Sequence, residues 1–354
     1  MSSTTRTHIL GGATSCDKSR EPHKSPGLDG MCLEFFKTAR DMIKNDLLQI
    51  INLMYIEEKL TTRQLQGLTV CLPKKTNSKY VEDYRPLTLL NTDYKILAPI
   101  TANRLRTYMT EILHPKKYCG LQGNSAFDAV AAIRETVAFA EITRTTLCIV
   151  SIDCSSAFDN ISYSYLMSMF NAHGFSDWIQ QRIMGMYNVA ASEVQINGFR
   201  SSPIQINISV IQGCPLSMQS FALCLNLFIQ TLEKELQGIK IGRGQPKTAV
   251  TAYADDVTIF LSTPDDIGKL HDILNTYEAA TGAMVNMTKS RALALGTWDT
   301  PLKIMDIPCH TGVQILGYHF TNKVNTSAKE TWSMVTEKVR ALAIGNLLQK
   351  SELE

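Results

Sequence analysis

The chain has 354 residues, 44% of them hydrophobic and 19% charged, with a formal net charge of +2. This composition is typical of a globular protein that buries a large core in two or three subdomains, and it excludes a fibrous or low-complexity chain. The nine cysteines include no C-x-x-C pair, so they favour neither a disulfide framework nor a zinc site and indicate reduced, intracellular thiols.

The distribution of charge and hydropathy argues against a membrane protein or a secreted protein. Residues 201–232 carry no formal charge, but Pro, Asn, Gln and Gly residues interrupt the run and argue against a membrane span, and no signal-peptide pattern opens the chain. Residues 61–120 hold ten Lys and Arg against four Asp and Glu, whereas residues 145–270 hold seven against ten. This asymmetry is expected if one surface meets phosphates and another meets metal ions.

The N-terminal third of the chain predicts helices around one basic strand. Residues 1–20 are polar and without periodicity, so we expect them to be disordered. A Pro-Gly turn then leads into a helix that opens near Gly30 and a second helix with apolar residues at helical spacing. The stretch LTVCLPKK predicts a short strand and a basic turn, and two longer amphipathic helices follow, the second capped by Ser125.

From residue 147 the pattern changes to strands. LCIVSID is a continuous apolar run that ends in a carboxylate, which is typical of a buried central strand whose last residue reaches the sheet edge. A helix is expected from about Ser162, a hairpin around Asn197-Gly198, and a buried helix over SMQSFALCLNLFIQTLEKEL. RALALG and QILGYHF predict two late strands.

The stretch TAVTAYADDVTIFLS sets Asp255 and Asp256 between two apolar runs, which predicts a second hairpin. Taken alone, the acidic pair is compatible with a solvated hairpin tip, because Asp favours turns. If this hairpin pairs with the strand that ends at Asp153, three carboxylates converge on one sheet edge. Oxygen ligands of this kind suit Mg²⁺ or Mn²⁺, and two such ions are a standard device for in-line phosphoryl displacement.

Several motifs in order carry a resemblance to a known family. The central motifs resemble the palm motifs of reverse transcriptases, and the flanking ones match their arrangement in non-LTR (LINE-like) retrotransposons. In chain order the motifs are KSPGLDGMCLEFFK, LPKK, DYRPLTLLNTDYKILAPITANRL, SIDCSSAFDNIS, IQGCPLSMQSFALCLN, YADDVTIFL and ILGYHF. The resemblance covers roughly residues 24–320. It implies an α/β (α+β) right-hand polymerase core of reverse-transcriptase type.

The resemblance implies a metal site and a proton donor. Asp153 and Asp255 would bind two Mg²⁺ ions, or Mn²⁺, with help from the main-chain carbonyl of Cys154, and Asp256 would complete the cluster. Lys289, in VNMTKSRAL, matches a lysine proposed to protonate the leaving pyrophosphate.

It also implies a nucleotide site. Phe158 occupies the place of the family's steric gate, where an aromatic ring blocks a ribose 2′-OH; its alternative is a plain core residue. Lys74 and Arg85 match residues of the fingers that grip the triphosphate, although either alone would more often be a solvated surface charge. Gln212 and Gly213 match a loop that packs against nucleotide and template.

Two further features concern the nucleic acid. Leu316, Gly317 and Tyr318 resemble the primer grip. The residue before Gln212 is Ile211, where the family usually has Arg, so we expect weaker template contacts.

These motifs predict fingers over 21–146 and again over 178–210, a palm over 147–320, and the start of an incomplete thumb over 321–354. The expected function is RNA-directed DNA synthesis from an RNA template, a DNA primer and dNTPs, without a membrane. No endonuclease is recognised before residue 20, so we also expect a fragment of a mobile-element protein. The alternative is a catalytically silent, nucleic-acid-binding remnant; an intron maturase would need a splicing extension. Oligomeric state and cellular compartment are not indicated.

Overall fold

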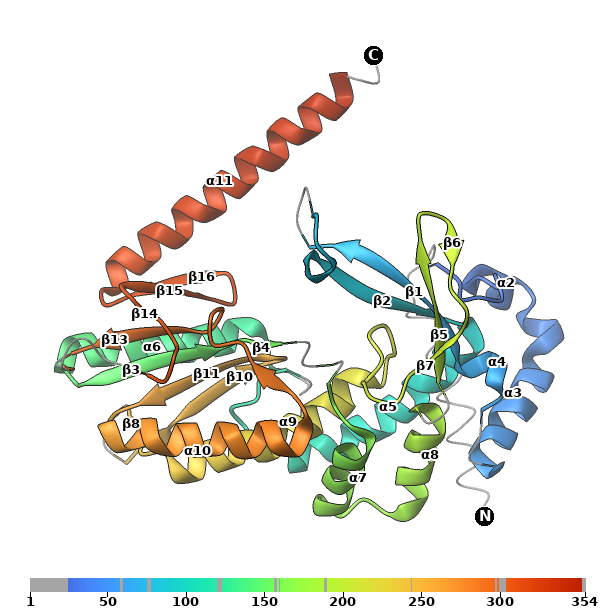
Figure 1. Cartoon of the computed structure of the whole chain (residues 1–354), viewed down its shortest axis with the longest axis horizontal. Coiled ribbons are helices and arrows are strands. Elements are labelled where there is room, and N and C mark those ends of the chain that lie inside the picture. Colours follow the sequence, from blue (N-terminus) through green and yellow to red (C-terminus); the bar gives the residue numbers. More distant parts are fainter. Residues whose placement is uncertain are drawn as a thin grey trace. The chain divides into compact units, whose positions relative to one another are not determined.

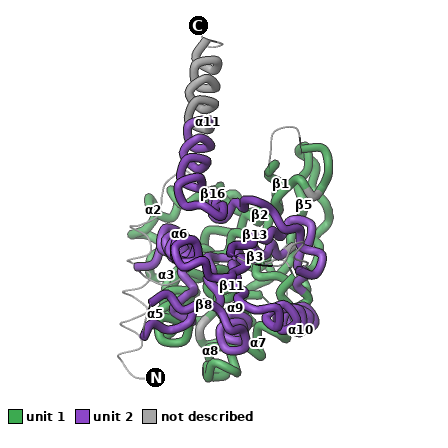
Figure 2. Tube along the Cα trace, turned by 90° about the vertical axis from the view of Figure 1, so that its left-hand side faces the viewer, with its two compact units in different colours: residues 1–113, 156–225, 280–282 green, residues 114–155, 226–279, 283–354 purple. Residues whose placement is uncertain are grey.

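The computed structural model describes residues 25–351, except 58–59, 75–77, 120–122, 156–157, 159, 188–189, 243, 297 and 299–303. The segment expected to be disordered, 1–20, and Asp159 therefore lie outside the described residues. The chain divides into two compact units, drawn in green and purple in Figure 2. Unit 1 comprises 1–113, 156–225 and 280–282, and unit 2 comprises 114–155, 226–279 and 283–354. The predicted finger and palm boundaries stay a prediction, because this division does not define functional subdomains.

Unit 1 combines helices with one sheet (Figure 1). Its N-terminal elements are α2 (Leu33–Thr38), α3 (Arg40–Glu57), α4 (Thr62–Leu65), β1 (Gln66–Pro73), the 3-10 helix η1 (Val81–Asp83), β2 (Tyr84–Leu90) and α5 (Thr92–Ile112). Its later elements are α7 (Tyr163–Ala172), α8 (Asp177–Tyr187), β5 (Ala191–Ile196), β6 (Phe199–Arg200) and β7 (Ile204–Gln205).

The sheet of unit 1 has the order β2-β1-β5-β6, with β7 also paired to β5. Strand β1 is antiparallel to β2 and parallel to β5. The predicted basic strand is β1, whereas β2, which contains Pro86, was not predicted from its sequence pattern. Proline cannot donate to a ladder and is tolerated on an edge strand, which is where β2 lies in this order. The β5–β6 hairpin turns at Asn197-Gly198, both with positive φ, as predicted.

The Pro-Gly turn at the start of unit 1 is confirmed, and it packs against the start of α5. The amide of Gly30 donates to the carbonyl of Gly27, and α2 begins three residues later. A Cβ added to Gly27 would lie 2.1 Å from the Asn91 side-chain oxygen, so the close approach requires glycine. Asn91 in turn donates to the carbonyl of Arg63. One asparagine therefore joins the turn, α4 and α5.

Unit 2 is built around a second sheet. Its elements are α6 (Ala126–Thr143), β3 (Leu147–Ile152), β4 (Cys154–Ser155), β8 (Ile239–Lys240), β9 (Lys247–Thr248), β10 (Val250–Tyr253), β11 (Asp256–Leu261), β12 (Met284–Val285), β13 (Arg291–Leu295), β14 (Cys309–His310), β15 (Gly312–Ile315), β16 (Tyr318–Thr321) and α11 (Val324–Ser351). Two helices, α9 (Ser217–Glu235) and α10 (Pro264–Thr281), have residues in both units. Ser125 forms the predicted cap of α6 through a capping box with Asp128.

The sheet of unit 2 has the order β10-β11-β3-β13-β14, so β3 is its central strand, as predicted. It pairs antiparallel with β11 on one side and with β13 on the other. Leu147 to Val150 are each 0% exposed, which explains why the strand reads as a continuous apolar run. The TAVTAYADDVTIFLS stretch forms the predicted hairpin, as β10 and β11.

Alternate residues of these strands build the core of unit 2. Ile149, Phe260 and Leu293 join Ile133 and Val137 of α6 in one buried cluster, which β15 and β16 extend. Helices α9 and α10 run along the sheet in Figure 1, and the rings of Phe228 and Tyr277 hold them together at 4.4 Å between centroids.

The prediction of a single late strand over QILGYHF is wrong. The segment forms a hairpin, in which Ile315 pairs with Tyr318 across a two-residue turn. Leu316 and Gly317 both have positive φ, at 51° and 81°. Such φ values are typical of a type I′ turn, which usually carries Asn-Gly rather than Leu-Gly. Because leucine is not typical of such a turn, the sequence pattern gave no sign of the hairpin.

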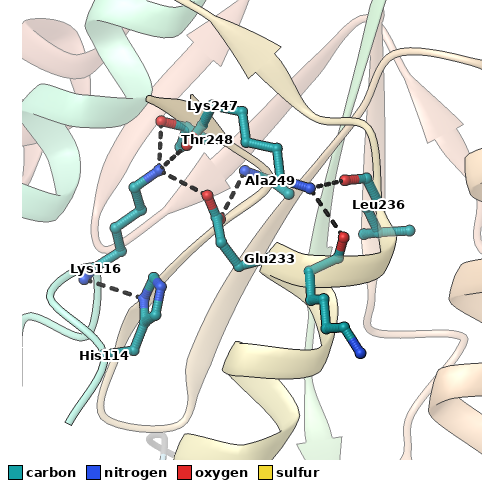
Figure 3. A network of polar contacts seen from close by, with 8 residues as sticks. His114, Lys116, Glu233, Leu236, Lys247, Thr248 and Ala249 are labelled. Atoms are coloured by element: carbon teal, nitrogen blue, oxygen red, sulfur yellow. Dashed lines mark hydrogen bonds and ion pairs between the residues drawn. The ribbon is translucent and has the colours of Figure 1, made fainter. Parts of the chain in front are cut away.

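A polar network joins the end of α9 to β9 and to the segment before α6 (Figure 3). The Lys116 ammonium lies 3.1 Å from the Glu233 carboxylate and also donates to the Lys247 carbonyl and the Thr248 hydroxyl. The other Glu233 oxygen accepts from the amide of Ala249. Only 20% of the Lys116 and 15% of the Glu233 side chain is exposed, so the pair is partly desolvated. Removal of either partner would leave a charge that water solvates poorly.

We expect Glu233→Ala to lower the free energy of unfolding by about 3 kcal/mol, because it strands the Lys116 charge and the Ala249 amide. Urea unfolding followed by circular dichroism measures this loss. Lys269→Ala is the control, since it removes the exposed Lys269–Asp265 pair on α10 and should leave the midpoint almost unchanged. Equal midpoints for Glu233→Ala and the parent protein would contradict the role given to this network.

Candidate active site

The three predicted carboxylates lie at the ends of paired strands in unit 2. Asp153 follows β3, Asp256 begins β11, and Asp255 lies in the two-residue turn between β10 and β11. Ile152 pairs with Val257, so Asp153 and Asp256 lie one residue beyond that pair at the same edge of the sheet. Ala254 completes the turn with φ of 52°, a conformation that costs free energy for a residue with a Cβ.

All three carboxylates are exposed, yet they interact electrostatically. Incomplete solvation raises the pKa of Asp256 to about 6, and the charges of Asp255 and Asp153 add to the rise. Burial likewise raises the pKa of the Cys154 thiol to about 12, with further contributions from Asp153 and Asp255. Without a cation, this edge of the sheet therefore disfavours additional negative charge.

The donor set suits a hard divalent cation, although its members are not gathered around one point. Carboxylate oxygens are the ligands that Mg²⁺ and Mn²⁺ prefer. Among the described residues, no group of three His, Cys, Asp or Glu side chains lies close enough together to hold an ion. Ion binding by all three of Asp153, Asp255 and Asp256 therefore requires movement of these side chains, all of which are exposed.

Lys289 lies on a turn that contacts the main chain of Asp153. The turn runs from Asn286 to Ser290, and the amides of both Lys289 and Ser290 donate to the carbonyl of Asn286. The amide of Asn286 donates to the carbonyl of Asp153, at 2.8 Å. The predicted proton donor is thus on a turn that is hydrogen-bonded to the main chain of Asp153.

Lys74 and Arg85 lie on the β1–β2 hairpin of unit 1. Arg85 is exposed and pairs with Leu72 across the ladder, and Lys74 follows two residues after Leu72. Arg85 therefore projects from the same face of the ladder as Leu72, and Lys74 directly follows the last residue of β1. The amide of Lys74 donates to the carbonyl of Asp83, which holds Lys74 at the end of the strand.

The predicted nucleotide loop packs against the same hairpin. The carbonyl of Gln212 accepts from the amide of Thr88 in β2, at 3.0 Å. Gly213 has φ of 106°, and an added Cβ would lie 2.5 Å from the Thr88 carbonyl oxygen, so only glycine fits. The loop and the basic hairpin thus form one structure in unit 1.

Phe158 is partly exposed and stacks on Phe221 of α9, with 4.3 Å between ring centroids. Its carbonyl accepts from the amide of Val210, which ties it to the segment that leads into Gln212. Phe221 therefore supports one face of the ring, and the main chain of Phe158 is bound to the segment that precedes Gln212. Ile211, by contrast, is 3% exposed and is a packing residue.

The residues predicted as the primer grip occupy the β15–β16 turn of unit 2. Tyr318 is 39% exposed, whereas Leu316 packs against the core cluster of α6 and β3. Leucine at this turn thus anchors the hairpin and leaves the tyrosine accessible.

Comparison of the sequence with models of known protein families identifies the family of this chain. The family model described as reverse transcriptase (RNA-dependent DNA polymerase) matches residues 72–320, more than half of the chain. The chain belongs to the reverse transcriptase family. The resemblance to reverse transcriptases of non-LTR retrotransposons is therefore confirmed, together with the expected fold class.

Relatives of this reverse transcriptase chain come from transposable elements. It is 32% identical over 277 residues to the transposon TX1 uncharacterized 149 kDa protein of Xenopus laevis, covering 78% of the chain and 21% of the relative. It is 25% identical over 265 residues to the Pol polyprotein of the type-2 retrotransposable element R2DM of Drosophila melanogaster, covering 75% of the chain and 24% of the relative. The chain thus spans about a quarter or less of these relatives.

Solved structures of similar fold include apo telomerase from Candida tropicalis, with a TM-score of 0.54 and 12% identity over 79% of this chain and 52% of that one. The apo telomerase truncated from its C-terminal domain has a TM-score of 0.53 and 13% sequence identity. The match covers 74% of this chain and 54% of that one. At such identities the likeness supports the fold alone. In the part of the chain that the structure describes, no helix combines the length and apolar character needed to cross a membrane.

We expect Asp255→Asn to stabilise the metal-free protein, because it removes one charge from the carboxylate edge. In the parent protein, the folded Asp256 holds its proton up to about pH 6 while the unfolded residue releases it near its usual, lower pKa. The folded form therefore loses stability as the pH rises between these values. Asp255→Asn should lower the pKa of Asp256 and flatten this loss, as measured by NMR titration and by thermal unfolding from pH 4 to 7. An unchanged Asp256 pKa would contradict the electrostatic contact.

Proposed function

We propose that the chain is an RNA-directed DNA polymerase that adds dNTPs to the 3′-OH of a DNA primer paired to an RNA template. The observation that carries the proposal is the placement of Asp153, Asp255 and Asp256 at one edge of the unit 2 sheet, where β3 ends and β11 begins, in a chain of the reverse transcriptase family. Mutually repelling, exposed carboxylates at the edge of a buried sheet contribute little to folding, and a cation would compensate their charge.

In this proposal, divalent cations supply Lewis-acid stabilisation of the charge that develops on the transferred phosphoryl group. Asp153 and Asp255 would hold two such ions, Mg²⁺ or Mn²⁺, with the main-chain carbonyl of Cys154 assisting, and Asp256 would complete the set. Lys289, on the turn attached to Asp153, would give a proton to the leaving pyrophosphate.

The basic hairpin and its loop would bind the incoming nucleotide. Lys74 and Arg85 both lie on the β1–β2 hairpin and would hold the triphosphate, since both carry charge suited to phosphate oxygens. Gln212 and Gly213 would pack against the nucleotide, and Phe158 would exclude a ribose 2′-OH. Tyr318, with Leu316 and Gly317 shaping its turn, would contact the primer.

The second candidate function is a catalytically silent, nucleic-acid-binding remnant. It is favoured by the observation that no three potential ligands are gathered for an ion among the described residues. A silent remnant would bind a primer–template duplex but would not extend the primer in Mg²⁺ or Mn²⁺.

Primer extension on an RNA template tests the proposal. We expect single-nucleotide incorporation by the parent chain at low salt, and a loss on the order of a thousandfold or more for Asp255→Asn, because the change keeps shape and removes a ligand charge. Asp265→Asn, an exposed carboxylate at the start of α10, is the control and should retain parental activity. A folded parent that binds duplex without incorporating a nucleotide would support the silent remnant.

We expect Phe158→Val to raise the ratio of rNTP to dNTP incorporation by about tenfold or more, since the lost ring would admit the 2′-OH. The ratio is measured within one preparation, so a lower folded fraction after loss of the stack on Phe221 does not affect it. Phe199→Ala, on the exposed β5–β6 hairpin, is the control. A ratio equal to that of the parent would make Phe158 a plain packing residue.

A further inference from the structure

We infer that Ser290 is a positioning residue for the Asp153 carboxylate, acting through the main chain of Asp153. The inference rests on the proposed function, because it assumes that Asp153 holds a divalent ion. It concerns a side chain for which the motifs alone implied no role.

Two hydrogen bonds join the main chain of Asp153 to the Asn286–Ser290 turn, and we call this pair of contacts the clamp. The amide of Asp153 donates to the Ser290 hydroxyl oxygen at 3.1 Å, and the carbonyl of Asp153 accepts from the amide of Asn286 at 2.8 Å. Both polar groups of the Asp153 main chain are thus bound by one short turn, 133 to 137 residues later in the chain. The side chain, which begins between these two groups, has its starting direction fixed.

The hydroxyl of Ser290 is itself held in place. It donates to the carbonyl of Asn286 at 2.8 Å while it accepts from Asp153, and the residue is only 1% exposed. Water therefore cannot replace the hydroxyl without a rearrangement. Alanine at this position would leave the Asp153 amide without its acceptor.

The turn that carries Ser290 is stiffened by further contacts. The Asn286 side-chain oxygen accepts from the Thr288 hydroxyl at 2.8 Å and from the Lys289 amide at 3.0 Å. The Arg291 guanidinium donates to the carbonyls of Thr288 and Ser290. A rigid turn transmits its position to Asp153, and a loose one would not.

The clamp continues on the far side of Asp153. Cys154 and Ser155 pair with Val285 and Met284, as the short ladder of β4 and β12. The amide of Val285 donates to the Glu278 carboxylate of α10 at 2.7 Å, which anchors the ladder to a long helix. Asp153 therefore lies between β3 and a short ladder made with the segment that leads into the turn.

The turn also connects two residues with predicted roles, Lys289 and Asp153. Lys289 directly precedes Ser290, so a displacement of the turn would move both Lys289 and the hydroxyl that accepts from the Asp153 amide. Ser290 thereby couples the placement of the proton donor to the direction of a metal-binding carboxylate.

Mn²⁺ titration by calorimetry tests the inference without requiring catalysis. We expect Ser290→Ala to weaken Mn²⁺ binding by about tenfold, the lower end of the range for residues that orient metal ligands. Ser290→Thr keeps the hydroxyl and should recover most of the affinity. The exchange rate of the Asp153 amide hydrogen, measured by NMR, should rise in Ser290→Ala and not in Ser290→Thr.

Ser327→Ala is the matched control, because Ser327 makes the same pair of contacts in another place. Its hydroxyl accepts from the amide of Thr321 and donates to the carbonyl of Lys323, four residues earlier, and it is 8% exposed. Its loss should lower stability to a similar extent while Mn²⁺ affinity stays at the parental value. A purely structural effect would be the same in both alanine variants.

The outcomes separate this inference from the proposed function. Parental Mn²⁺ affinity in Ser290→Ala, or an equal loss in Ser327→Ala, would overturn the inference. If Ser290→Thr misfolds, the Asp153 amide exchange and the Mn²⁺ affinity of Ser290→Ala still decide it. A parent chain that binds Mn²⁺ but extends no primer would contradict the proposed function, and the Mn²⁺ titration of the variants would still test Ser290.

Discussion

The site depends on the pairing of β3 on both of its edges. β11 and β13 occupy the two sides of this strand, and its residues are buried against α6 on one face, so its register cannot slip without exposing core side chains. The pairing of Ile152 with Val257 then places Asp153 and Asp256 at one edge, and the turn at Ala254 brings Asp255 beside them. Burial of apolar surface along the strands thus balances the repulsion between carboxylates at their ends.

The residues with proposed roles are distributed over both units. The carboxylates, Lys289 and the β15–β16 turn belong to unit 2, whereas Lys74, Arg85, Phe158 and the Gln212–Gly213 loop belong to unit 1. In each unit a hairpin or loop is held by main-chain contacts that glycine or a positive φ makes possible, as at Gly213 and at the Leu316–Gly317 turn. In each unit, main-chain contacts therefore set the position of the residues to which the proposal gives a role.

Patterns of local origin were predictable. The apolar run before Asp153 indicated a central strand, the Asn197-Gly198 pair indicated a turn, and the stretch SMQSFALCLNLFIQTLEKEL indicated a buried helix; each is confirmed. Features set by distant residues were not predictable. Strand β2 contains a proline, which a sheet tolerates only at its edge, and the sequence does not show that β2 is an edge strand. Leu316 adopts a positive φ, which is unusual for leucine and is not predictable from its residue type. The Ser290 contact joins residues 137 apart, and no local pattern reports it. The roles of the site residues stay predictions that derive from family motifs.

The most direct test of the account is the location of Mn²⁺ by anomalous scattering in crystals of the chain bound to a primer–template duplex and a dNTP. The account predicts anomalous peaks within coordination distance of the carboxylate oxygens of Asp153 and Asp255, next to the nucleotide phosphates, with the hydroxyl of Ser290 still bound to the Asp153 amide. A well-ordered duplex and nucleotide without a peak at these carboxylates, or with Mn²⁺ bound only elsewhere, would contradict it.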